Sequence, residues 1–373
     1  DLLLGGSAIG GGGASTFVEN YSSGTLPLAA GTNGISIGIM SSASGANSFA
    51  VGRQAVASGT YSFAGGGFCT ASGTGSAALG GSGLASGAVT ASSAWSTAIG
   101  LNSAAYGSIA AGSGAVSIGG SYASGTDSFA AAIATNSSSY GATGANSIAM
   151  GPSSKATNSY AVAIGWSQTA SGHQSVVLGG NSSTASGYNS FALGRMITSS
   201  NTYSIGMGND CTASQEASIA LGQGASSAVH GKLAHSGKKF NAVGDAQGGT
   251  FVLLSDTTDA TAEAMTTSNS TASATNQIVA ASDTCITFSG TIVAMQNGAQ
   301  AYGSWKIEGL LVNDGGTTTV PTSAITVINN SSSWGLALSA DNTNNALAVT
   351  VTGEASHNIR WVANIQTAEV TYA

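Results

Sequence analysis

The stretch Ser48-Phe49-Ala50-Val51-Gly52 carries a pattern, Ser-x-Ala-x-Gly, that recurs along much of the chain, as in Ser76-Ala77-Ala78-Leu79-Gly80 and Ser218-Ile219-Ala220-Leu221-Gly222. Its glycines recur at one fixed interval in two runs, Gly52, Gly66 and Gly80, then Gly151, Gly165 and Gly179. A second phrase, Ala-Ser-Gly, ends with the same spacing at Gly45, Gly59, Gly73 and Gly87. Repetition at a short fixed period predicts a solenoid, whose coils bury apolar surface only by stacking on their neighbours.

Each repeat can be interpreted as one coil of two short strands and two turns. Side chains alternate along a strand, so Phe49 and Val51 share a bulky apolar face while Ser48, Ala50 and Gly52 share a face of small residues. Small residues on one face indicate that a second backbone comes close. The period alone does not distinguish the opposite wall of a narrow coil from another subunit. Gly, Ser and Asn between the phrases supply the turns.

Composition agrees with an ordered solenoid. Charged residues make up 6% of the 373 residues, against roughly 25% in typical domains, and 55 residues are glycine. A disordered Gly/Ser/Ala-rich linker has a similar composition, but it has no reason to place Phe, Ile, Val or Leu at a fixed interval. The periodicity therefore favours the solenoid.

Charge and hydropathy exclude several classes of partner. The net charge is −7 and the only basic pair is Lys238-Lys239, so we expect no nucleic-acid partner. No run of 18 apolar residues is present, so we expect no membrane insertion. The start at Asp1-Leu2-Leu3-Leu4 lacks both an initiator Met and the features of a signal peptide, which indicates a processed or truncated chain.

Three cysteines, Cys69, Cys211 and Cys285, cannot all pair within one chain, and none belongs to a Cys-x-x-Cys motif. We expect them to be small buried hydrophobic residues. This usage is typical of a protein assembled in a reducing cytosol and released by lysis.

The repeats, from about residue 35 to residue 222, resemble the head repeats of trimeric autotransporter adhesins. That family forms a left-handed parallel β-roll of three intertwined chains, so the resemblance implies a homotrimer. Insertions interrupt the register near Trp95, Asn136 and Ile197. Viral fibres also use such repeats, so the resemblance implies a trimeric β-roll spacer more directly than a bacterial adhesin.

A second resemblance covers residues 244 to 373. The phrases Gly244-Asp245-Ala246-Gln247, Thr257-Thr258-Asp259-Ala260-Thr261, Val351-Thr352-Gly353-Glu354-Ala355 and Ile359-Arg360-Trp361-Val362-Ala363 are similar, in order, to the C-terminal module of tailed-bacteriophage tail-fibre proteins. Ala262-Glu263-Ala264-Met265 departs from that module, where Pro-Thr-Glu-Leu is usual.

The residues of this module also predict its fold class. Short segments rich in β-branched residues, separated by Asn, Gly or Ser, predict an antiparallel sandwich; they are Gln277–Ala280, Thr284–Phe288, Thr291–Met295, Ala324–Ile328 and Leu347–Thr352. Trp305, Trp334 and Trp361 are expected to anchor its core. The predicted fold is therefore all-β, a parallel β-roll of 14-residue coils followed by a neck and an antiparallel sandwich. The expected domains are a cap or attachment segment (1–34), the repeat rod (35–222), a neck (223–249) and the sandwich (250–373).

No motif predicts an enzyme. Glycoside cleavage requires two carboxyl groups held a fixed distance apart, yet the repeats contain only Asp127, Asp210 and Glu216, of which Asp210 and Glu216 form the one conceivable pair. The run Gly10–Gly13 lacks the Gly-Lys-Ser/Thr sequence of a phosphate-binding loop. We therefore predict no catalytic residue and no cofactor.

Two further groups of residues admit more than one interpretation. His230 and His235, if three chains meet there, are candidates for a metal or anion site on a three-fold axis, although surface histidines without a ligand are commoner. Aromatic residues interrupt the small-residue pattern and either stack on sugars or act as wedges in widened coils; they are Trp95, Trp166, Tyr106, Tyr122, Tyr140, Tyr160 and Tyr188. His173, in a turn, needs no functional explanation.

These features favour a homotrimeric virion fibre, such as a phage tail fibre, in which the repeats are a spacer and the C-terminal tip attaches to the host cell. The expected partners are further copies of the chain, other tail or baseplate proteins, and a host surface receptor such as a glycan. The candidate receptor contacts are loop residues: Asn313, Asp314, Asp341, Asn342 and Asn344. The alternatives are a structural or decorating fibre of the virion and a bacterial trimeric surface adhesin. The adhesin family has a membrane-anchoring barrel preceded by a coiled coil, and neither pattern occurs in this sequence.

Overall fold

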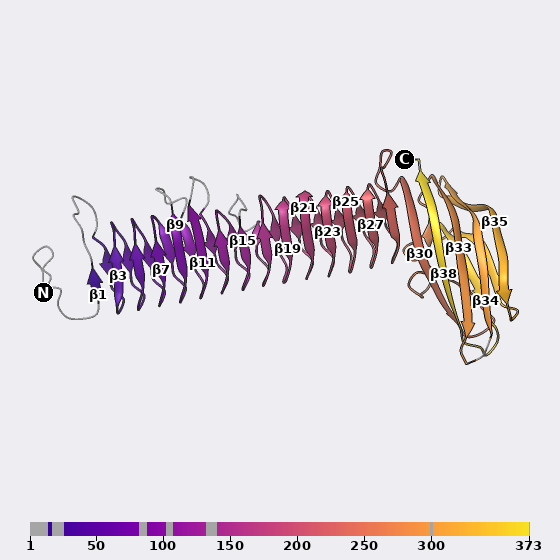
Figure 1. The fold of residues 1–373 in the computed structure, drawn as a ribbon, viewed down its shortest axis with the longest axis horizontal. Helices are drawn as coiled ribbons and strands as arrows, with labels where there is room; N and C mark the ends of the chain where they lie inside the picture. Colours follow the sequence, from indigo (N-terminus) through magenta and orange to yellow (C-terminus); the bar gives the residue numbers. More distant parts are fainter. Residues whose placement is uncertain are drawn as a thin grey trace, which may run out of the picture. The chain divides into compact units, whose positions relative to one another are not determined.

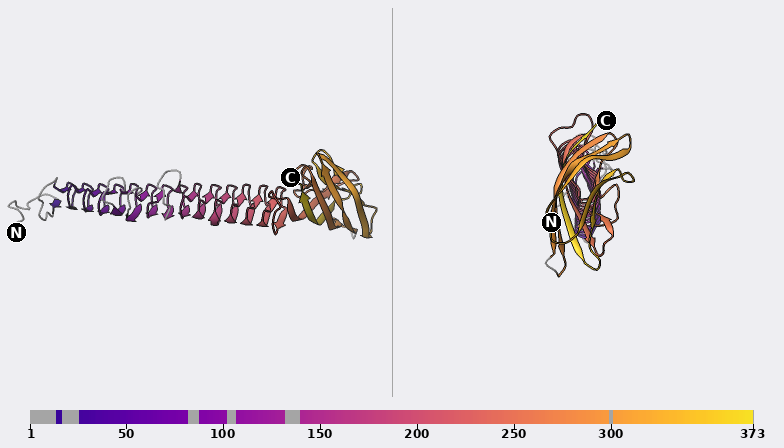
Figure 2. Two further views of the ribbon diagram at one scale, coloured as in Figure 1. Left: turned by 90° about the horizontal axis from the view of Figure 1, so that it is seen from above. Right: turned by 90° about the vertical axis from the view of Figure 1, so that its right-hand side faces the viewer.

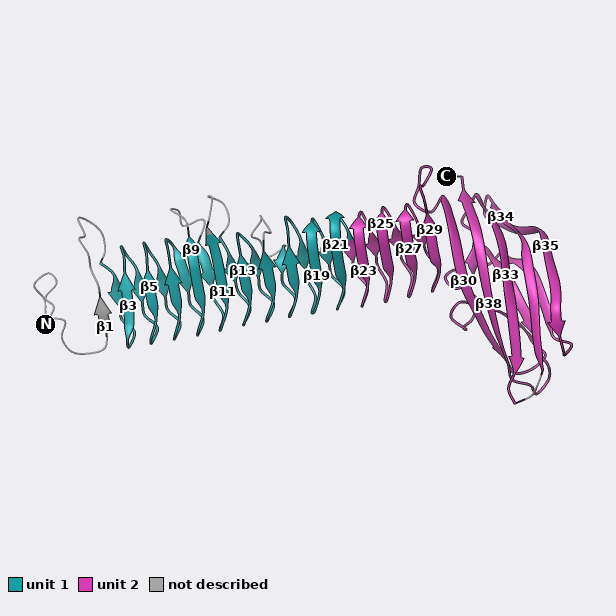
Figure 3. Cartoon of the chain, viewed as in Figure 1, with its two compact units in different colours: residues 1–183 teal, residues 184–373 magenta. Residues whose placement is uncertain are grey.

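The computed structural model describes residues 14–16, 26–81, 88–101, 107–131, 140–298 and 301–372. The chain forms two compact units, residues 1–183 and residues 184–373 (Figure 3). The glycine run Gly10–Gly13, most of the expected N-terminal segment and Tyr106 lie outside the described residues.

The first unit is a stack of coils, each contributing one strand to each of two parallel sheets (Figures 1 and 2). Sheet 1 carries the Ser-x-Ala strands: β1 (Ala14–Thr16), β3 (Gly34–Ile37), β5 (Phe49–Val51), β7 (Phe63–Gly65), β9 (Ala77–Gly81), β11 (Thr97–Leu101), β13 (Val116–Ile118), β15 (Phe129–Ala131), β17 (Ile148–Met150), β19 (Val162–Trp166) and β21 (Val176–Asn181). Sheet 2 carries the strands between them: β2 (Leu28–Ala29), β4 (Ser42–Ala43), β6 (Val56–Ala57), β8 (Cys69–Ala71), β10 (Val89–Ala91), β12 (Ile109–Ala110), β14 (Tyr122–Ala123), β16 (Gly141–Ala142), β18 (Lys155–Ala156) and β20 (Thr169–Ala170).

The interior of each coil is filled by alanine and serine. Ala50 of sheet 1 and Ala57 of sheet 2 are fully buried, as are their counterparts in successive coils. The small face of the repeat therefore packs against the opposite wall of its own narrow coil and not against another subunit. Phe49 and Val51 point to the outside and are only half buried.

Serine at the start of the repeat also fixes the preceding turn. The hydroxyl groups of Ser76, Ser147 and Ser175 donate to the carbonyl oxygens of Gly73, Gly144 and Gly172 at 2.7, 2.6 and 2.7 Å. We call this turn, which leads into the Ser-x-Ala strand, the leading turn, and the turn that follows the strand the trailing turn. The serine thus satisfies a buried backbone acceptor within the coil.

Two columns of glycine allow the coils to stack this closely. At Gly59, in a leading turn, a Cβ atom would overlap the carbonyl oxygen of Gly73 in the next coil. At Gly52, in a trailing turn, a Cβ atom would meet the backbone of Gly66, and the φ of 123° is one that other residues rarely adopt. The regular spacing of both phrases therefore follows from backbone contact between successive coils.

Insertions leave the ladder in register. Ala77 of β9 pairs with Thr97 of β11 although their separation in sequence is longer than one repeat. The solenoid thus tolerates longer turns because only the strands and glycine columns take part in stacking.

The second unit begins with further coils. Sheet 1 strands here are β23 (Phe191–Arg195), β25 (Ile205–Asn209), β27 (Ile219–Gln223) and β29 (Leu233–Ser236); sheet 2 strands are β22 (Thr184–Ala185), β24 (Thr198–Ser199), β26 (Thr212–Ala213) and β28 (Ser226–Ser227). Parallel pairing continues past residue 222, where the repeats are expected to end, because Ala234 follows Ala220 by one full repeat and is equally buried. Residues 223–236 thus form one more coil, even though their sequence has lost the Ser-x-Ala-x-Gly form.

Where a larger residue enters the coil interior, the facing residue is smaller, so the filled volume stays about the same. Ile197 is fully buried in a position that several other coils fill with smaller residues, such as Ala55, Ser154 and Cys211. The facing position is Gly206 in place of alanine, and a Cβ atom there would overlap Cγ2 of Ile197. A large residue on one wall is therefore accommodated by the loss of a methyl group on the other.

Two antiparallel sheets follow the coils. The large sheet has the order β30 (Ala246–Thr257), β38 (Ile359–Thr371), β33 (Thr284–Gln296), β34 (Tyr302–Asp314) and β35 (Thr317–Asn330) (Figure 1). In the small sheet, β37 (Ala346–Thr352) pairs on one side with β36 (Gly335–Asp341) and on the other with β31 (Ala262–Ala264) and β32 (Ile278–Val279). The two strands expected at 284–288 and 291–295 form the single strand β33, because Gly290 pairs within the ladder without interrupting it.

The two sheets share one hydrophobic core. Phe251, Ile286 and Ile307 of the large sheet are buried in one cluster with Leu347 and Val349 of the small sheet. The three expected anchors, Trp305, Trp334 and Trp361, also belong to it. Trp361 stacks on Trp305 with ring centroids 5.4 Å apart and donates from Nε1 to Thr257 at 3.0 Å. The prediction that the tryptophans anchor the core is confirmed.

The predicted fold class is confirmed. Within the described residues the chain is all-β, with a parallel solenoid of about 14 coils and then antiparallel sheets. Cys69 and Cys211 are buried as expected, and burial raises the pKa of Cys69 to about 11, whereas Cys285 is only half buried. No helix in the described parts of the chain is long and apolar enough to cross a membrane.

The glycine columns generate a stability prediction. We expect Gly59→Ala to lower the free energy of unfolding by about 1–3 kcal/mol, because the new methyl group overpacks against the Gly73 carbonyl. Ser58→Ala, at the adjacent exposed residue, is the matched control and should change it by less than about 0.5 kcal/mol. Urea denaturation followed by circular dichroism measures both. Equal midpoints for the two variants would contradict this account of the glycine columns.

Candidate functional site

The outer face of sheet 1 carries two adjacent columns of large apolar side chains, which we call the outer columns. In the first unit they comprise Ile35, Phe49, Phe63, Val116, Phe129, Ile148, Val162 and Val176 in one column, and Ile37, Val51, Leu79, Ile99, Ile118, Met150, Ile164 and Leu178 in the other. All of these side chains are half buried or exposed in the single chain. Phe49 and Phe63 stack with ring centroids 5.3 Å apart. Apolar surface this extensive marks an interaction site.

The second unit continues this arrangement into its antiparallel sheet. Its outer columns contain Phe191, Ile205, Ile219 and Leu233, and beside them Leu193, Met207 and Leu221. The last solenoid strand, β29, pairs antiparallel with β30, with Leu233 opposite Thr250 and Ala234 opposite Gly249. Residues opposite each other share a face. The outer face of sheet 1 therefore continues in this unit as the exposed face of the large sheet, through Thr250 and Val252.

The last coil is joined to the large sheet by a buried ion pair. Lys232 occupies the inward position that serine fills one coil earlier, at Ser218. Its Nζ lies 2.7 Å from Oε2 of Glu369, and the two side chains are 6% and 7% exposed. Gln247 and Thr367 also donate to the Glu369 carboxylate, each at 2.7 Å. A cavity of about 330 Å³ adjoins this ion pair. The charges are therefore fully paired, as a buried site requires.

A second carboxylate organises the connection between the coil and the sheet. Asp245 accepts hydrogen bonds from the backbone N–H groups of Phe240, Asn241 and Ala242 at 2.9, 2.6 and 2.7 Å. Burial alone would raise the pKa of Asp245, but these three bonds and the charge of Lys239 hold it below its ordinary value. Residues 237–245 thus form an ordered turn, held by the charged form of one side chain.

The large sheet ends in an open edge. β35 is 14 residues long, and among the described strands it forms its ladder with β34 alone. Ile325, Val327 and Ile328 are exposed along it. An unpaired strand edge with apolar side chains is a template for pairing with another chain, and Pro321 partly blocks it because proline has no N–H to donate. Sequence patterns indicated a strand here but gave no sign that it would lie at the edge.

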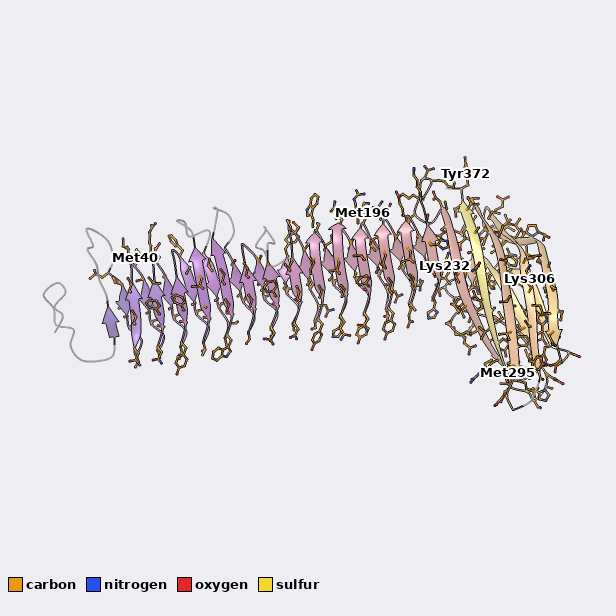
Figure 4. The ribbon with its side chains drawn as sticks, viewed as in Figure 1. Met40, Met196, Lys232, Met295, Lys306 and Tyr372 are labelled. Atoms are coloured by element: carbon orange, nitrogen blue, oxygen red, sulfur yellow. The ribbon has the colours of Figure 1, made fainter. Side chains whose placement is uncertain are left out.

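A hollow of about 640 Å³ lies at the turn end of the large sheet, where it is lined by Asp256, Met295, Asn297, Asn358 and Arg360. Met295 is exposed, and Figure 4 places it at the opposite end of this sheet from Tyr372. Arg360 faces Asp256 at 3.6 Å. Exposed amide, carboxylate and guanidinium groups beside an apolar surface are suited to binding a polar ligand. Sequence analysis did not single out these residues, since they come from three separate turns and strand ends.

The structure brings the candidate receptor loops together. The backbone N–H of Thr318, at the start of β35, donates to Oδ1 of Asn342 at 2.8 Å, which joins the end of the turn between β34 and β35 to the loop after β36. Asn313 is only 1% exposed, and its side chain donates to the carbonyl oxygen of Ala280 at 2.8 Å. Asp314 is exposed. The two loops therefore form one surface at the end of the sheet where β33 begins.

Within that surface, Asp341 holds its own turn. Its carboxylate accepts hydrogen bonds from the backbone of Thr343 and from both the backbone and the side chain of Asn344. Burial would raise the pKa of Asp341, but these hydrogen bonds lower it overall. The polar groups of Asp341, Asn342 and Asn344 are thus engaged in shaping the loops that were proposed to contact a receptor, and this role stays a prediction.

The two histidines lie apart in the last coil. His235 is on β29, exposed on the outer face, whereas His230 is half buried in the leading turn, where its N–H donates to the carbonyl of Thr275. No group of three His, Cys, Asp or Glu side chains among the described residues is arranged to hold a metal ion. Within one chain, therefore, neither histidine belongs to a ligand cluster.

The three carboxylates considered for glycan cleavage are also dispersed. Asp210 follows β25 in a trailing turn and forms an ion pair with Lys239 at 2.5 Å. Glu216 lies in the leading turn at the other end of β26 and is exposed. Asp127 belongs to the first unit. Asp210 therefore neutralises a lysine of the connection rather than facing Glu216.

The wedge interpretation is wrong for most of the aromatic residues. Trp95, Trp166, Tyr160 and Tyr188 are exposed at the turns, and Tyr122 and Tyr140 are half buried. The narrow Ala/Ser interior has no room for a ring, so an aromatic residue in a coil must point outward.

Comparison with known protein families supports the similarity of the repeats to adhesin head repeats. The family model of the YadA head domain repeat (2 copies) matches residues 29–55, 43–68, 142–167, 170–195 and 199–225. Repeats of this kind imply a homotrimer and suggest an adhesin-like fibre on an extracellular surface, and such solenoids are typically structural rather than enzymatic. No curated protein sequence matches the chain. The similarity to adhesin head repeats is confirmed, and the resemblance of residues 244–373 to a tail-fibre module stays a prediction.

The buried ion pair generates a stability prediction. We expect Lys232→Met to lower the free energy of unfolding by about 3–5 kcal/mol, because the Glu369 charge stays buried without its cation. The double variant Lys232→Met/Glu369→Met should recover most of this loss. Lys306→Met, which breaks the exposed pair with Glu308, is the control and should cost about 0–1 kcal/mol. Urea denaturation of the wild type and these three variants measures the differences; a double variant less stable than Lys232→Met would contradict the role of the pair.

The pKa of Asp245 generates a pH prediction. Because its folded pKa is below the ordinary value of about 3.9, its stabilisation is present above that value and is lost as the pH falls through the folded pKa. Asp245→Asn should therefore be less stable than the wild type at pH 7, with the difference shrinking as the pH falls below about 4. Urea midpoints of both proteins from pH 7 to pH 3 test this, and a constant difference across the range would exclude a role for the charge.

Proposed function

We propose that the protein is a homotrimeric virion fibre that attaches to a host cell through its C-terminal sheets, with the repeat solenoid as the spacer. Its location is the virion, outside the cell after release. Its partners are further copies of itself, other tail or baseplate proteins, and a host receptor such as a glycan. The family match supports the trimeric, adhesin-like part of this proposal.

The observation that supports trimer formation most strongly is the exposure of the outer columns in the single chain. An interior of alanine and serine buries little apolar area per residue, whereas the large apolar residues of each repeat point outward. Burying one Val, Leu, Ile or Phe side chain contributes about 1.5–3 kcal/mol. Three chains that bring these columns together would therefore gain much of the stability that the single coil lacks.

Two features support a role for the C-terminal sheets in attachment. The end of the large sheet presents the open edge of β35, and the turn end presents a hollow with mixed polar and apolar groups. Both are carried on long strands around a tryptophan-rich core, which holds them in fixed positions. The resemblance of residues 244–373 to a tail-fibre module favours a phage origin.

A bacterial trimeric surface adhesin is the second candidate, and the head-repeat match favours it equally. In that case the same solenoid would project from a bacterial surface, and the C-terminal sheets would join it to further parts of a longer protein. A decorating virion fibre without receptor binding is the third. The three candidates differ in what the C-terminal sheets contact. In an attachment fibre they contact a host-cell receptor, in a bacterial adhesin further parts of the same protein, and in a decorating fibre another virion protein.

The outer columns generate a prediction on assembly. We expect Phe63→Asp to yield folded monomers, because a charge in the column would be buried by the neighbouring chains but stays half exposed in the single chain. Ser58→Asp, at an exposed leading-turn residue of the same coil, should stay trimeric. Size-exclusion chromatography with light scattering gives the masses, and circular dichroism confirms folding. A trimeric Phe63→Asp protein would exclude the outer columns as the interface.

Attachment is tested by competition. Purified trimer added to suspected host cells should lower the number of phage particles that adsorb, in proportion to dose. The Phe63→Asp monomer should compete far less, by about 10²–10⁴-fold in concentration, because multivalency is lost. Unchanged adsorption with folded trimer would contradict the attachment role and favour the decorating fibre. Binding of the trimer to animal cells instead would favour the bacterial adhesin.

A further inference from the structure

The leading turns of the first unit form a ladder along one edge of the solenoid. In each, the residue before the Ser-x-Ala strand has a positive φ, and its N–H donates to the turn of the preceding coil: Tyr61 to Ala46, Gly75 to Thr60 and Trp95 to Thr74, at 2.9, 2.8 and 2.8 Å. Successive positions of this ladder are therefore one coil apart, about 4.8 Å.

Most coils fill this position with residues suited to it. Asn33, Asn47 and Asn146 adopt φ values of 55–57°, and Gly75 and Gly114 adopt 66° and 67°. Asparagine and glycine tolerate this conformation, whereas a bulky residue there is an outlier. Three aromatic residues nevertheless occupy it: Tyr61, Trp95 and Tyr160, with φ of 58–59°. Bulky residues with a positive φ also occur in the trailing turns, at Met40 and Phe68, so the exposure of the three rings, rather than the backbone conformation, is the observation to explain.

Burial does not explain these aromatic residues. Trp95 is 67% exposed, Tyr61 is 63% exposed and Tyr160 is 53% exposed, although the Tyr160 ring also contacts the His173 ring edge-on at 5.6 Å. Folding gains little from a ring left in water, and an Asn or Gly would satisfy the turn without strain. The rings also lie on the turn edge rather than in the outer columns, which are on the face of sheet 1.

Trp95 is held flat by the coil before it. A Cβ atom at Gly75 would overlap Cε3 and Cζ3 of the indole, so the ring rests directly on the backbone of that glycine. The Asp127 side chain packs on Gly114 in the same way, with its Oδ1 atom above the glycine. Tyr61 precedes Gly75 by one coil, so two exposed rings flank it at a separation of about two coils, roughly 10 Å.

We propose that this edge, from Tyr61 past Trp95 and Asp127 to Tyr160, binds an extended neutral polysaccharide. The exposed face of a fixed indole stacks on the apolar face of a sugar ring, and the Asp127 carboxylate and Asn146 amide can hydrogen-bond to hydroxyl groups. The regular spacing of the coils suits a polymer that lies along the edge. Asp127 is the charged side chain in the leading turns described between Tyr61 and Tyr160, and its negative charge disfavours an acidic polysaccharide.

Binding by this edge, which we call the aromatic strip, does not depend on the attachment role proposed for the C-terminal sheets. A spacer that itself binds surface polysaccharide would keep the fibre close to the cell coat through many weak contacts. Loss of C-terminal binding would leave the strip intact, and loss of the strip would leave the C-terminal sheets intact.

The proposal is tested on the assembled protein with a substitution that should not disturb folding. Trp95→Asn places at this turn the residue that other coils use, so its thermal stability should equal or exceed that of the wild type. Trp166→Ala is the matched control, since Trp166 is another exposed tryptophan of this unit but lies at the trailing end of β19. Native gels containing a soluble β-glucan, a galactomannan or a neutral O-antigen polysaccharide measure binding as retardation.

We expect at least one of these polysaccharides to retard the wild type and Trp166→Ala equally, and Trp95→Asn to bind it about tenfold more weakly or worse. The same polysaccharide should shift the tryptophan fluorescence of the first two proteins only. Retardation by none of the three, or equal retardation of Trp95→Asn, would overturn the proposal. Shielding of Trp95 from acrylamide in the free trimer would also overturn it, because the ring would then be an interface residue.

Discussion

The close approach of successive coils is the constraint on which the rest of the structure depends. At Gly59 and Gly52 the next coil lies where a side chain would begin, and inside the coil Ala50 and Ala57 leave room for little more than methyl groups. A coil this narrow cannot contain a conventional hydrophobic core. The large residues of the repeat must therefore point outward, which makes the solenoid dependent on contacts outside its own chain.

The same constraint explains how the coils of the second unit end. A stack of parallel strands has an open edge at its last coil, and here β30 covers that edge with an antiparallel strand. The interior position that serine occupies elsewhere becomes Lys232, which reaches Glu369 on β38. The large sheet thus extends the solenoid sheet in this unit, and its own final strand, β35, leaves an edge that another chain could pair with.

The coils could be predicted from the sequence because their signal is local and repeated. Period, turn residues and the small face all follow from Ser-x-Ala-x-Gly, and together they are sufficient to identify the fold class. The last coil was missed because Leu233-Ala234 keeps the spacing while Lys232 and His235 replace the familiar residues. The pairing of Lys232 with Glu369, distant in the chain, and the edge position of β35 depend on long-range topology, which composition and period do not contain. The exposure of Trp95 could have been inferred, because an interior of alanine has no space for an indole.

The central claim, that the outward apolar columns require association of three chains, is tested most directly by the mass of the purified protein. Sedimentation equilibrium over a wide range of concentrations should give a single species of three times the 35.9 kDa chain mass, with no dissociation at micromolar protein. A wild-type protein that sediments as a folded monomer would contradict the account.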